Sequence, residues 1–114
     1  VVTMVYGGLV NKQIVAKLQT LDVNAIGLTG ADAGTVLAQK RPVKEIDYGF
    51  VCDILEVDSG RIQAMLLQGL TPVYAPLTYD QFGHLLNTNA DTMASAIAVD
   101  MATRNAVTLV YCFE

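Results

Sequence analysis

Hydrophobic and polar positions change their spacing several times along the chain, and each change marks the boundary of an expected element. Three segments carry apolar residues three and four positions apart, which is the spacing of a helix with one buried face. The helices are expected from Asn11, from Asp58 or Ser59 to about Gly69, and from about Ala90 to Thr103. Gly7 and Gly8 are expected to break the apolar segment before the first helix, which Asn11 is expected to cap. Between them lie short apolar runs bounded by Gly, Pro, Asn and Asp, as is typical of strands. The expected strands cover residues 23–28, 36–40, 48–57, 72–77, 85–87 and 107–113.

The order of these elements predicts an α/β fold. Strands 23–28, 72–77 and 107–113 are apolar runs separated by helices, which favours parallel pairing with right-handed crossovers. Two hairpins are also expected, one around Pro42 and one with its turn at 80–83. Ligands bind beyond the carboxyl ends of the strands in sheets of this kind. Because both hairpins leave those ends, we place the candidate site there.

Composition and charge fit a small globular domain and argue against several classes of function. The 114 residues are 53% hydrophobic and 16% charged, which suits a sheet buried on both faces and one domain at most. The net charge is −4 and the one cationic cluster is small (Lys40, Arg41 and Lys44), so we expect no nucleic-acid partner. No apolar run is long enough to span a bilayer, and we expect no signal peptide. We therefore expect a cytoplasmic protein with no membrane partner.

Residues that bind metals or act as nucleophiles are few. Cys52 and Cys112 lack metal-ligand spacing and lie in apolar runs, so we expect buried free thiols in a reducing compartment. His84 is the single histidine, which argues against a transition-metal site and against a nucleophilic triad. The segment 29–34 lacks the Gly-Lys-Ser/Thr of a phosphate-binding loop, and we interpret it as a turn.

The segment 86–91, Leu-Asn-Thr-Asn-Ala-Asp, is the most informative stretch of the chain. Asn87 and Asn89 alternate in an extended segment and so share a face, and Asp91 falls in the first turn of the next helix. Free N–H groups at a helix N-terminus attract anions, and carboxamides hold carboxylates, so these residues predict a site for a charged small molecule. The commoner interpretation is structural, with Asn89 as the N-cap and Asp91 as a favourable first-turn charge.

Five stretches carry a longer pattern. They are Gly-Leu-Val-Asn-Lys-Gln-Ile-Val at 8–15, Ala-Ile-Gly-Leu-Thr-Gly-Ala-Asp at 25–32, Asp-Tyr-Gly-Phe-Val at 47–51, Pro-Val-Tyr-Ala-Pro at 72–76, and the segment 86–91. In this order and register they resemble the central segment of the N-acetylglutamate kinases, a family of the amino acid kinase superfamily. Asn-x-Asn-Ala-Asp is the most specific of the five.

The resemblance implies a three-layer α/β/α sandwich with a mainly parallel sheet and β-hairpins at the substrate edge. It implies a phosphotransferase of arginine biosynthesis that passes the γ-phosphoryl group of MgATP to the side-chain carboxylate of an N-acyl-L-glutamate. Carried over by position, Asn87 and Asn89 bind the acylamino acid, with Asn87 on its α-carboxylate. Asp91 carries the catalytic role of organising two lysines.

The family's phosphate loop, substrate-binding arginine, nucleotide-binding half and two catalytic lysines have no counterpart in this sequence. We therefore expect residues 1–114 to be one partial domain, the acceptor-binding part of a longer polypeptide, and to be inactive alone. MgATP is then a co-substrate of the parent protein. Two departures stand out: Cys52 replaces an expected glycine, and Cys112-Phe113-Glu114 replaces an expected Ser/Thr-Asp ending. The choice between an acetyl and a succinyl acceptor stays open.

Other interpretations also stay open. The absence of both catalytic lysines favours a non-catalytic module of the same fold, for small-molecule binding or oligomerisation. Another amino acid kinase, of the carbamate or aspartate type, is a further alternative, against which the pair Asn87 and Asn89 argues. A homo-oligomer and feedback by arginine are equally open.

Overall fold

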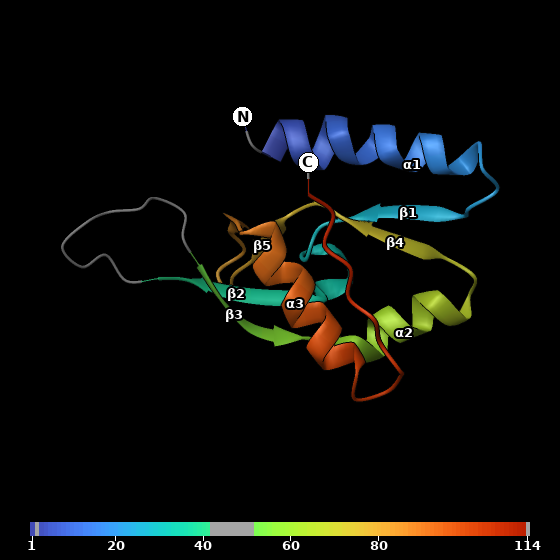
Figure 1. Ribbon diagram of the computed structural model, residues 1–114. Coiled ribbons are helices and arrows are strands. Elements are labelled where there is room, and N and C mark those ends of the chain that lie inside the picture. The colour runs from blue at the N-terminus through green and yellow to red at the C-terminus, as the bar shows by residue number, and fades with distance from the viewer. Residues whose placement is uncertain (2, 42–51, 114) are drawn as a thin grey trace.

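The computed structural model describes residues 1, 3–41 and 52–113, which form a mixed α/β fold (Figure 1). The helices are the π-helix η1 (Thr3–Val10), α1 (Asn11–Gln19), the short 3₁₀ turn η2 (Asp32–Gly34), α2 (Ser59–Leu67) and α3 (Ala90–Met101). The strands are β1 (Ala25–Leu28), β2 (Val36–Lys40), β3 (Cys52–Val57), β4 (Thr71–Tyr74), β5 (Leu77–Tyr79) and β6 (Leu85–Asn87). The expected loop around Pro42 and the first part of the expected strand 48–57 lie outside the described residues.

The described strands form two small sheets, where the sequence predicts one mainly parallel sheet. β1 and β4 pair in parallel. The second sheet has the order β3-β2-β5-β6, with β2 parallel to β5 and the pairs β2–β3 and β5–β6 antiparallel. The antiparallel pairs confirm the pairing predicted for both hairpins. Pro76 separates β4 from β5, because proline has no N–H to give to a ladder, and the expected strand 72–77 is thereby shared between the two sheets.

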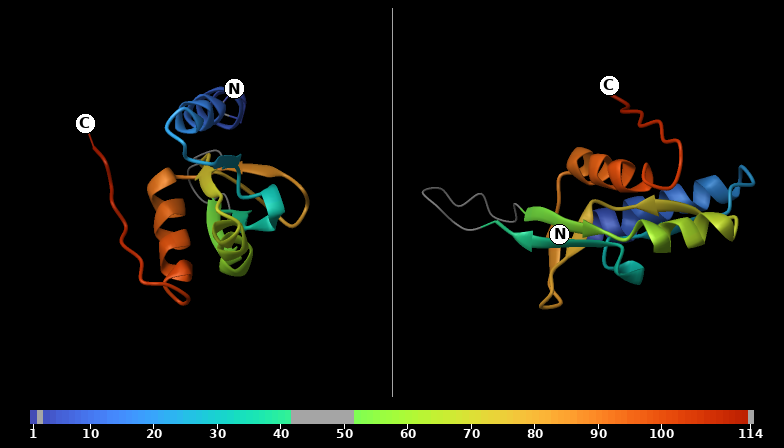
Figure 2. Two further views of the ribbon diagram at one scale, coloured as in Figure 1. Left: turned by 90° about the vertical axis from the view of Figure 1, so that its right-hand side faces the viewer. Right: turned by 90° about the horizontal axis from the view of Figure 1, so that it is seen from below.

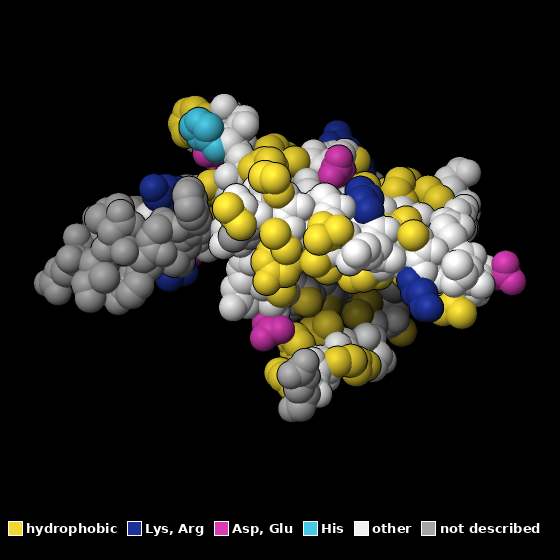
Figure 3. Space-filling model, turned by 90° about the horizontal axis from the view of Figure 1, so that it is seen from above, with side chains coloured by type: hydrophobic (Ala, Val, Ile, Leu, Met, Phe, Trp, Pro, Cys, Tyr) yellow, Lys and Arg dark blue, Asp and Glu magenta, His cyan; other side chains and the backbone are white. Residues whose placement is uncertain are grey.

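The N-terminal helix differs from its prediction. The expected break at Gly7 and Gly8 is absent, and η1 continues directly into α1. The expected N-cap role of Asn11 is wrong: its side chain is buried, and its Nδ2 donates to the carbonyl of Val73 in β4 at 2.9 Å. This bond joins residues far apart in sequence, so no local pattern signals it. Seen from above, hydrophobic side chains spread over the face that holds this helix (Figure 3), and Met4 and Leu9 are among its exposed residues.

The other two helices begin as predicted. The carboxylate of Asp58 accepts the N–H of Arg61 at 3.0 Å and so caps α2. The carbonyl oxygen of the Asn89 side chain accepts the N–H of Thr92 at 3.0 Å and caps α3. Gly69 follows α2 with a φ of 80°, a conformation that favours glycine, which confirms it as a helix stop.

The expected strand 107–113 is wrong. These residues form neither helix nor strand, and they run back past α3 outside both sheets (Figure 2). An apolar run signals burial, but a strand also needs a neighbour to pair with, and no described strand pairs with this one. Cys112 is consequently exposed and Cys52 is half-buried, so neither is the buried thiol that the sequence predicts, although both are free.

Helix α1 lies on one side of β1 and β4, and α2 lies on the other side and contacts β4 (Figure 1). Gly27 in β1 permits the approach of α1, since a Cβ there would overlap Oδ1 of Asn11 and lie 2.6 Å from Nζ of Lys12. Apolar core residues come from both sheets and from the helices, among them Val36, Leu77 and Met93. Within the described parts of the chain, no helix is both long and apolar enough to cross a bilayer.

Candidate functional site

The two carboxamides predicted from the sequence lie where β6 ends and α3 begins. Asn87 closes the short antiparallel pair with β5, opposite Leu77. The next residue continues the contact, because the N–H of Thr88 donates to the carbonyl of Pro76 at 3.0 Å. Asn89 has extended backbone angles (φ −64°, ψ 126°) and ends the extended segment as the N-cap of α3. The site is thus built on a strand end and a helix start, both fixed by backbone hydrogen bonds.

Burial alternates along this segment as the sequence predicts. Leu86 and Thr88 are buried, whereas Asn87 and Asn89 are exposed. Alternate residues of an extended chain point to opposite sides, so both carboxamides face solvent on the same side. The arrangement presents amide groups to solvent at the start of a helix, where backbone N–H groups add a partial positive charge.

The three predicted site residues differ in the contacts that their side chains make. The cap uses the Oδ1 atom of Asn89, which accepts from the N–H and the hydroxyl of Thr92, and its Nδ2 group has no hydrogen-bond partner among the described residues. Among the described residues, the Asn87 carboxamide has no hydrogen-bond partner. The exposed Asp91 carboxylate, in the first turn of α3, has no ion-pair partner among them either. The structure therefore brings the two amides and the acid into one segment, and it brings no described lysine to Asp91.

A cluster of small polar side chains beneath this segment was not predicted. The hydroxyls of Thr78 and Thr88 lie 2.8 Å apart, and the thiol of Cys52 lies 3.2 Å from the Thr88 hydroxyl. The same thiol is 3.6 Å from the carbonyl oxygen of Asn87. Sequence alternation places Thr88 opposite the two asparagines, but nothing local indicates that β3 and β5 supply its partners.

The hairpin turn that precedes the site is stabilised by Asp80. One carboxylate oxygen accepts the N–H groups of Phe82 and His84 at 2.9 and 2.8 Å, and the other lies 3.0 Å from Nδ1 of His84. Burial by itself would raise the pKa of Asp80, but the hydrogen bonds from His84 and Phe82 outweigh it and hold the pKa below its ordinary value. The turn thereby sets the entry of β6, and with it the position of Asn87.

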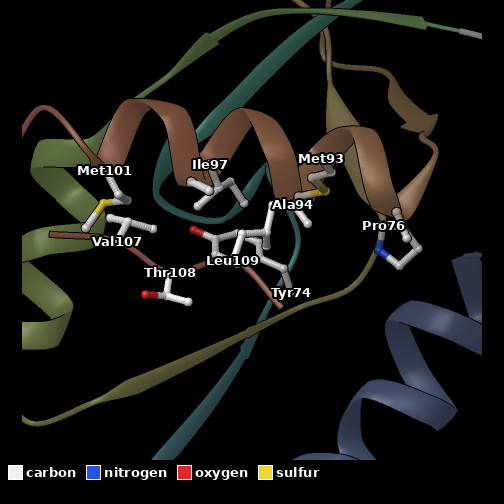
Figure 4. A pocket seen from close by; sticks show the side chains of 11 residues that line it. Tyr74, Pro76, Met93, Ala94, Ile97, Met101, Val107, Thr108 and Leu109 are labelled. Atoms are coloured by element: carbon white, nitrogen blue, oxygen red, sulfur yellow. The ribbon is translucent and has the colours of Figure 1, made fainter. Parts of the chain in front are cut away.

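An apolar groove opens on the other side of the site's helix. It has a volume of about 370 Å³ and lies between α3, Tyr74 and the C-terminal segment. Met93, Ile97 and Leu109 are among the residues that line it (Figure 4). Its lining is apolar apart from the side chains of Tyr74 and Thr108. Within the residues that the structure describes, no group of three His, Cys, Asp or Glu side chains is placed to hold a metal ion.

Comparisons with known proteins point to one family over nearly the whole chain. The sequence model of the amino acid kinase family matches residues 1–109. A protein of Parabacteroides distasonis is 59% identical over 114 residues, which are 100% of this chain and 45% of that protein. A protein of Cytophaga hutchinsonii is 61% identical over 115 residues, 100% of this chain and 44% of that protein. Both relatives carry the name acetylglutamate kinase.

A solved structure is also similar to this chain. A crystal structure of a Streptococcus mutans UA159 protein superposes with a TM-score of 0.77 at 30% identity, covering 88% of this chain and 40% of that one. The chain thus spans less than half the length of the curated relatives described above.

Proposed function

The chain belongs to the amino acid kinase family, and from this premise we propose that it is the acceptor-binding part of an acetylglutamate kinase. The protein transfers the γ-phosphoryl group of MgATP to the side-chain carboxylate of N-acetyl-L-glutamate. The observation that carries the proposal is the exposed pair Asn87 and Asn89 at the start of α3, in a chain about 60% identical to proteins of that name.

The chemistry of the reaction suits these residues. Phosphoryl transfer between two anions depends on positioning and charge neutralisation more than on covalent catalysis. Asn87 donates from its side-chain amide to the α-carboxylate of the acylamino acid, which adds no charge to a site that must also accept ATP. Asn89 keeps its Oδ1 on the helix cap and offers Nδ2 to the same ligand.

Asp91 has a different role in this proposal. Its carboxylate orients the cationic groups that neutralise the transferring phosphoryl group. None of the described lysines reaches the Asp91 carboxylate, so in this proposal the cations come from other residues of the full-length protein. We assign no residue of this chain to MgATP, and we place the described layers within a three-layer α/β/α sandwich whose hairpins edge the acceptor site.

Titration of the full-length protein with N-acetyl-L-glutamate tests the proposal. We expect saturable binding that Asn87→Ala weakens, and ATP consumption that depends on the acylamino acid. L-glutamate, which lacks the acyl group, is the matched control ligand. Binding without phosphoryl transfer would instead support the non-catalytic module, and no binding at all would refute the acceptor assignment.

A further inference from the structure

Beneath the two asparagines, three small polar side chains meet that come from separate parts of the sequence. Thr78 lies in β5, Cys52 is the first residue of β3, and Thr88 follows β6. Thr78 has no exposed surface and Thr88 is 7% exposed. The hydroxyl–hydroxyl distance is 2.8 Å and the thiol–Thr88 distance is 3.2 Å. The cluster Cys52–Thr78–Thr88 is thus a small hydrogen-bonded network in which both threonines are buried and Cys52 is half-buried.

The sheet topology makes this contact unusual. β3 and β6 occupy the two opposite edges of the sheet β3-β2-β5-β6, so they share no ladder hydrogen bonds. The thiol of Cys52 nevertheless reaches both Thr88 and the carbonyl oxygen of Asn87. The cluster therefore joins the two edges of the sheet across one face, directly at the segment that carries the proposed acceptor site.

Thr88 lies between the two asparagines in the sequence, so the contacts of its side chain affect the orientation of both. Its inward direction and the outward direction of Asn87 and Asn89 are linked by the alternation of an extended chain. Its hydroxyl contacts Thr78, Cys52 and, at 3.4 Å, the carbonyl of Leu86. A rotation of the segment that displaced either amide would pull this hydroxyl out of its network and leave the buried Thr78 hydroxyl without it.

We propose that Thr88 is a positioning residue of the acceptor site, and that its bonds to Thr78 and Cys52 set the direction of the carboxamides of Asn87 and Asn89. The proposal rests on the proposed function for the identity of the ligand, an N-acyl amino acid with a free carboxylate. The geometry of the network stands independently of that ligand. Cys52 couples the hairpin β2–β3 to the site, so the choice of residue at position 52 bears on acceptor affinity.

The test substitutes the Thr88 hydroxyl while keeping the β-branched shape. In the full-length protein we compare Thr88→Val with Thr88→Ser, which restores the hydroxyl, and with Thr103→Val in the turn that follows α3. Thr103 is a matched control, because its hydroxyl makes one exposed hydrogen bond, to the carbonyl of Asp100. The first readout needs no ligand: NMR signals of the Asn87 and Asn89 side-chain amides, with amide hydrogen exchange over residues 87–89.

We expect Thr88→Val to shift these amide signals and to speed exchange over residues 87–89, and Thr88→Ser to return both toward wild type. The second readout is the KM for N-acetyl-L-glutamate, which should rise about three- to tenfold in Thr88→Val, as the loss of a hydrogen bond implies, with the KM for ATP unchanged. Thr103→Val should leave both readouts as in wild type.

The outcomes separate the two proposals. Unchanged amide signals and exchange in Thr88→Val would overturn the positioning role, whether or not the ligand binds. Equal rises in both KM values would also overturn it, since they indicate a general loss of structure. If Thr88→Val changes the amide signals but the wild-type protein does not bind N-acetyl-L-glutamate, the positioning role is supported and the proposed function is refuted.

Alkylation of the thiols gives an independent arm. The reagent is iodoacetamide, and its rates are measured at the half-buried Cys52 beside the site and at the exposed Cys112 in the C-terminal segment, which is the internal comparison. We expect N-acetyl-L-glutamate to slow the modification of Cys52 and to leave that of Cys112 unaffected. Equal rates at Cys52 with and without a ligand that is shown to bind would contradict the link between β3 and the acceptor site.

Discussion

The side chain of Asn89 accepts the backbone N–H of Thr92 at 3.0 Å, so a residue of the candidate site is also the N-cap of α3. The structural and functional interpretations of this residue therefore do not exclude each other. The cap occupies Oδ1, and the proposed ligand contact uses Nδ2. Substitutions that change one atom and keep the other separate the two roles.

Asn89→Asp retains an oxygen for the cap and replaces the Nδ2 donor by a second carboxylate oxygen. Asn and Asp are similar as N-caps, so we expect a thermal midpoint close to wild type. The binding of N-acetyl-L-glutamate should fall sharply, because the new charge faces the ligand's carboxylate. Asn89→Ala, the companion variant, should lose about 0.5–2 kcal/mol of stability. Undiminished binding by Asn89→Asp would mean that Asn89 serves α3 alone.

Asn87→Ala tests the contact with the α-carboxylate. That carboxylate takes no part in the chemistry, so the contact exists equally in the ground state and the transition state. Its loss should raise the KM for N-acetyl-L-glutamate about tenfold or more, as for a hydrogen bond to a charged group, and leave kcat nearly unchanged. Steady-state kinetics with each substrate varied in turn measures this. A matching rise in the KM for ATP would argue against the assignment.

Local sequence signals predicted much of this region because the contacts involved are local. Asp58 and Asn89 cap their helices through residues three positions ahead, and the turn at 80–83 closes between adjacent strands. Asn11 was misread because its partner, Val73, lies 62 residues away. A polar residue before an apolar helical stripe looks the same whether it caps the helix or bonds to a distant strand.

The cluster beneath the site was missed for the same physical reason. Cys52 and Thr88 are 36 residues apart, and their contact depends on how the strands between them pair. The segment 107–113 is the reverse case, a strand that was predicted and is absent. Its hydrophobicity indicates that the segment tends to be buried, but a strand also requires a neighbouring strand to pair with. The residues alone predict a site for a charged small molecule at this segment, with two amides on one face. The family resemblance adds the acylamino acid as the ligand of Asn87 and Asn89 and the catalytic role of Asp91.

The lowered pKa of Asp80 predicts acid sensitivity at the hairpin turn. The folded pKa lies below that of the unfolded chain, so this carboxylate stabilises the fold fully above about pH 4. The contribution is lost as pH falls through the folded pKa. Asp80→Asn should therefore lower the thermal midpoint at neutral pH, and the difference from wild type should shrink in acid. Glu56→Gln, an exposed carboxylate on β3, is the control. A difference that does not depend on pH would contradict the role of the charge.

Residues 1–114 alone should show no acceptor-dependent ATP turnover. Among the described contacts, no lysine reaches Asp91, and each missing cationic group costs a factor of about 10²–10³ in transition-state stabilisation. The measurement is phosphate transfer by the purified 114 residues with MgATP, with and without N-acetyl-L-glutamate. Circular dichroism must first show that the sample is folded. Turnover above the background of a sample without the acylamino acid would show that the chain holds its own cationic groups.

Asp91→Asn in the full-length protein decides between a helix-terminal charge and a functional acid. A charge that only favours the N-terminus of α3 contributes about 0.3–1 kcal/mol, so its loss would lower the thermal midpoint slightly and leave kcat intact. An acid that orients cations around the phosphoryl group acts in the transition state. Its neutralisation should lower kcat by about 10²-fold or more while the fold, with Asn89 still capping the helix, keeps its stability. We expect the second pattern. Asp91 is exposed and its carboxylate has no ion-pair partner among the described residues, so it is available to orient cations from elsewhere in the full-length protein.

Thermal midpoint and kcat measured on the same preparation distinguish the two roles of Asp91. Asp100→Asn near the end of α3 is the control for a charge change on that helix. A lowered midpoint with kcat retained would leave Asp91 a structural charge and remove it from the proposed site.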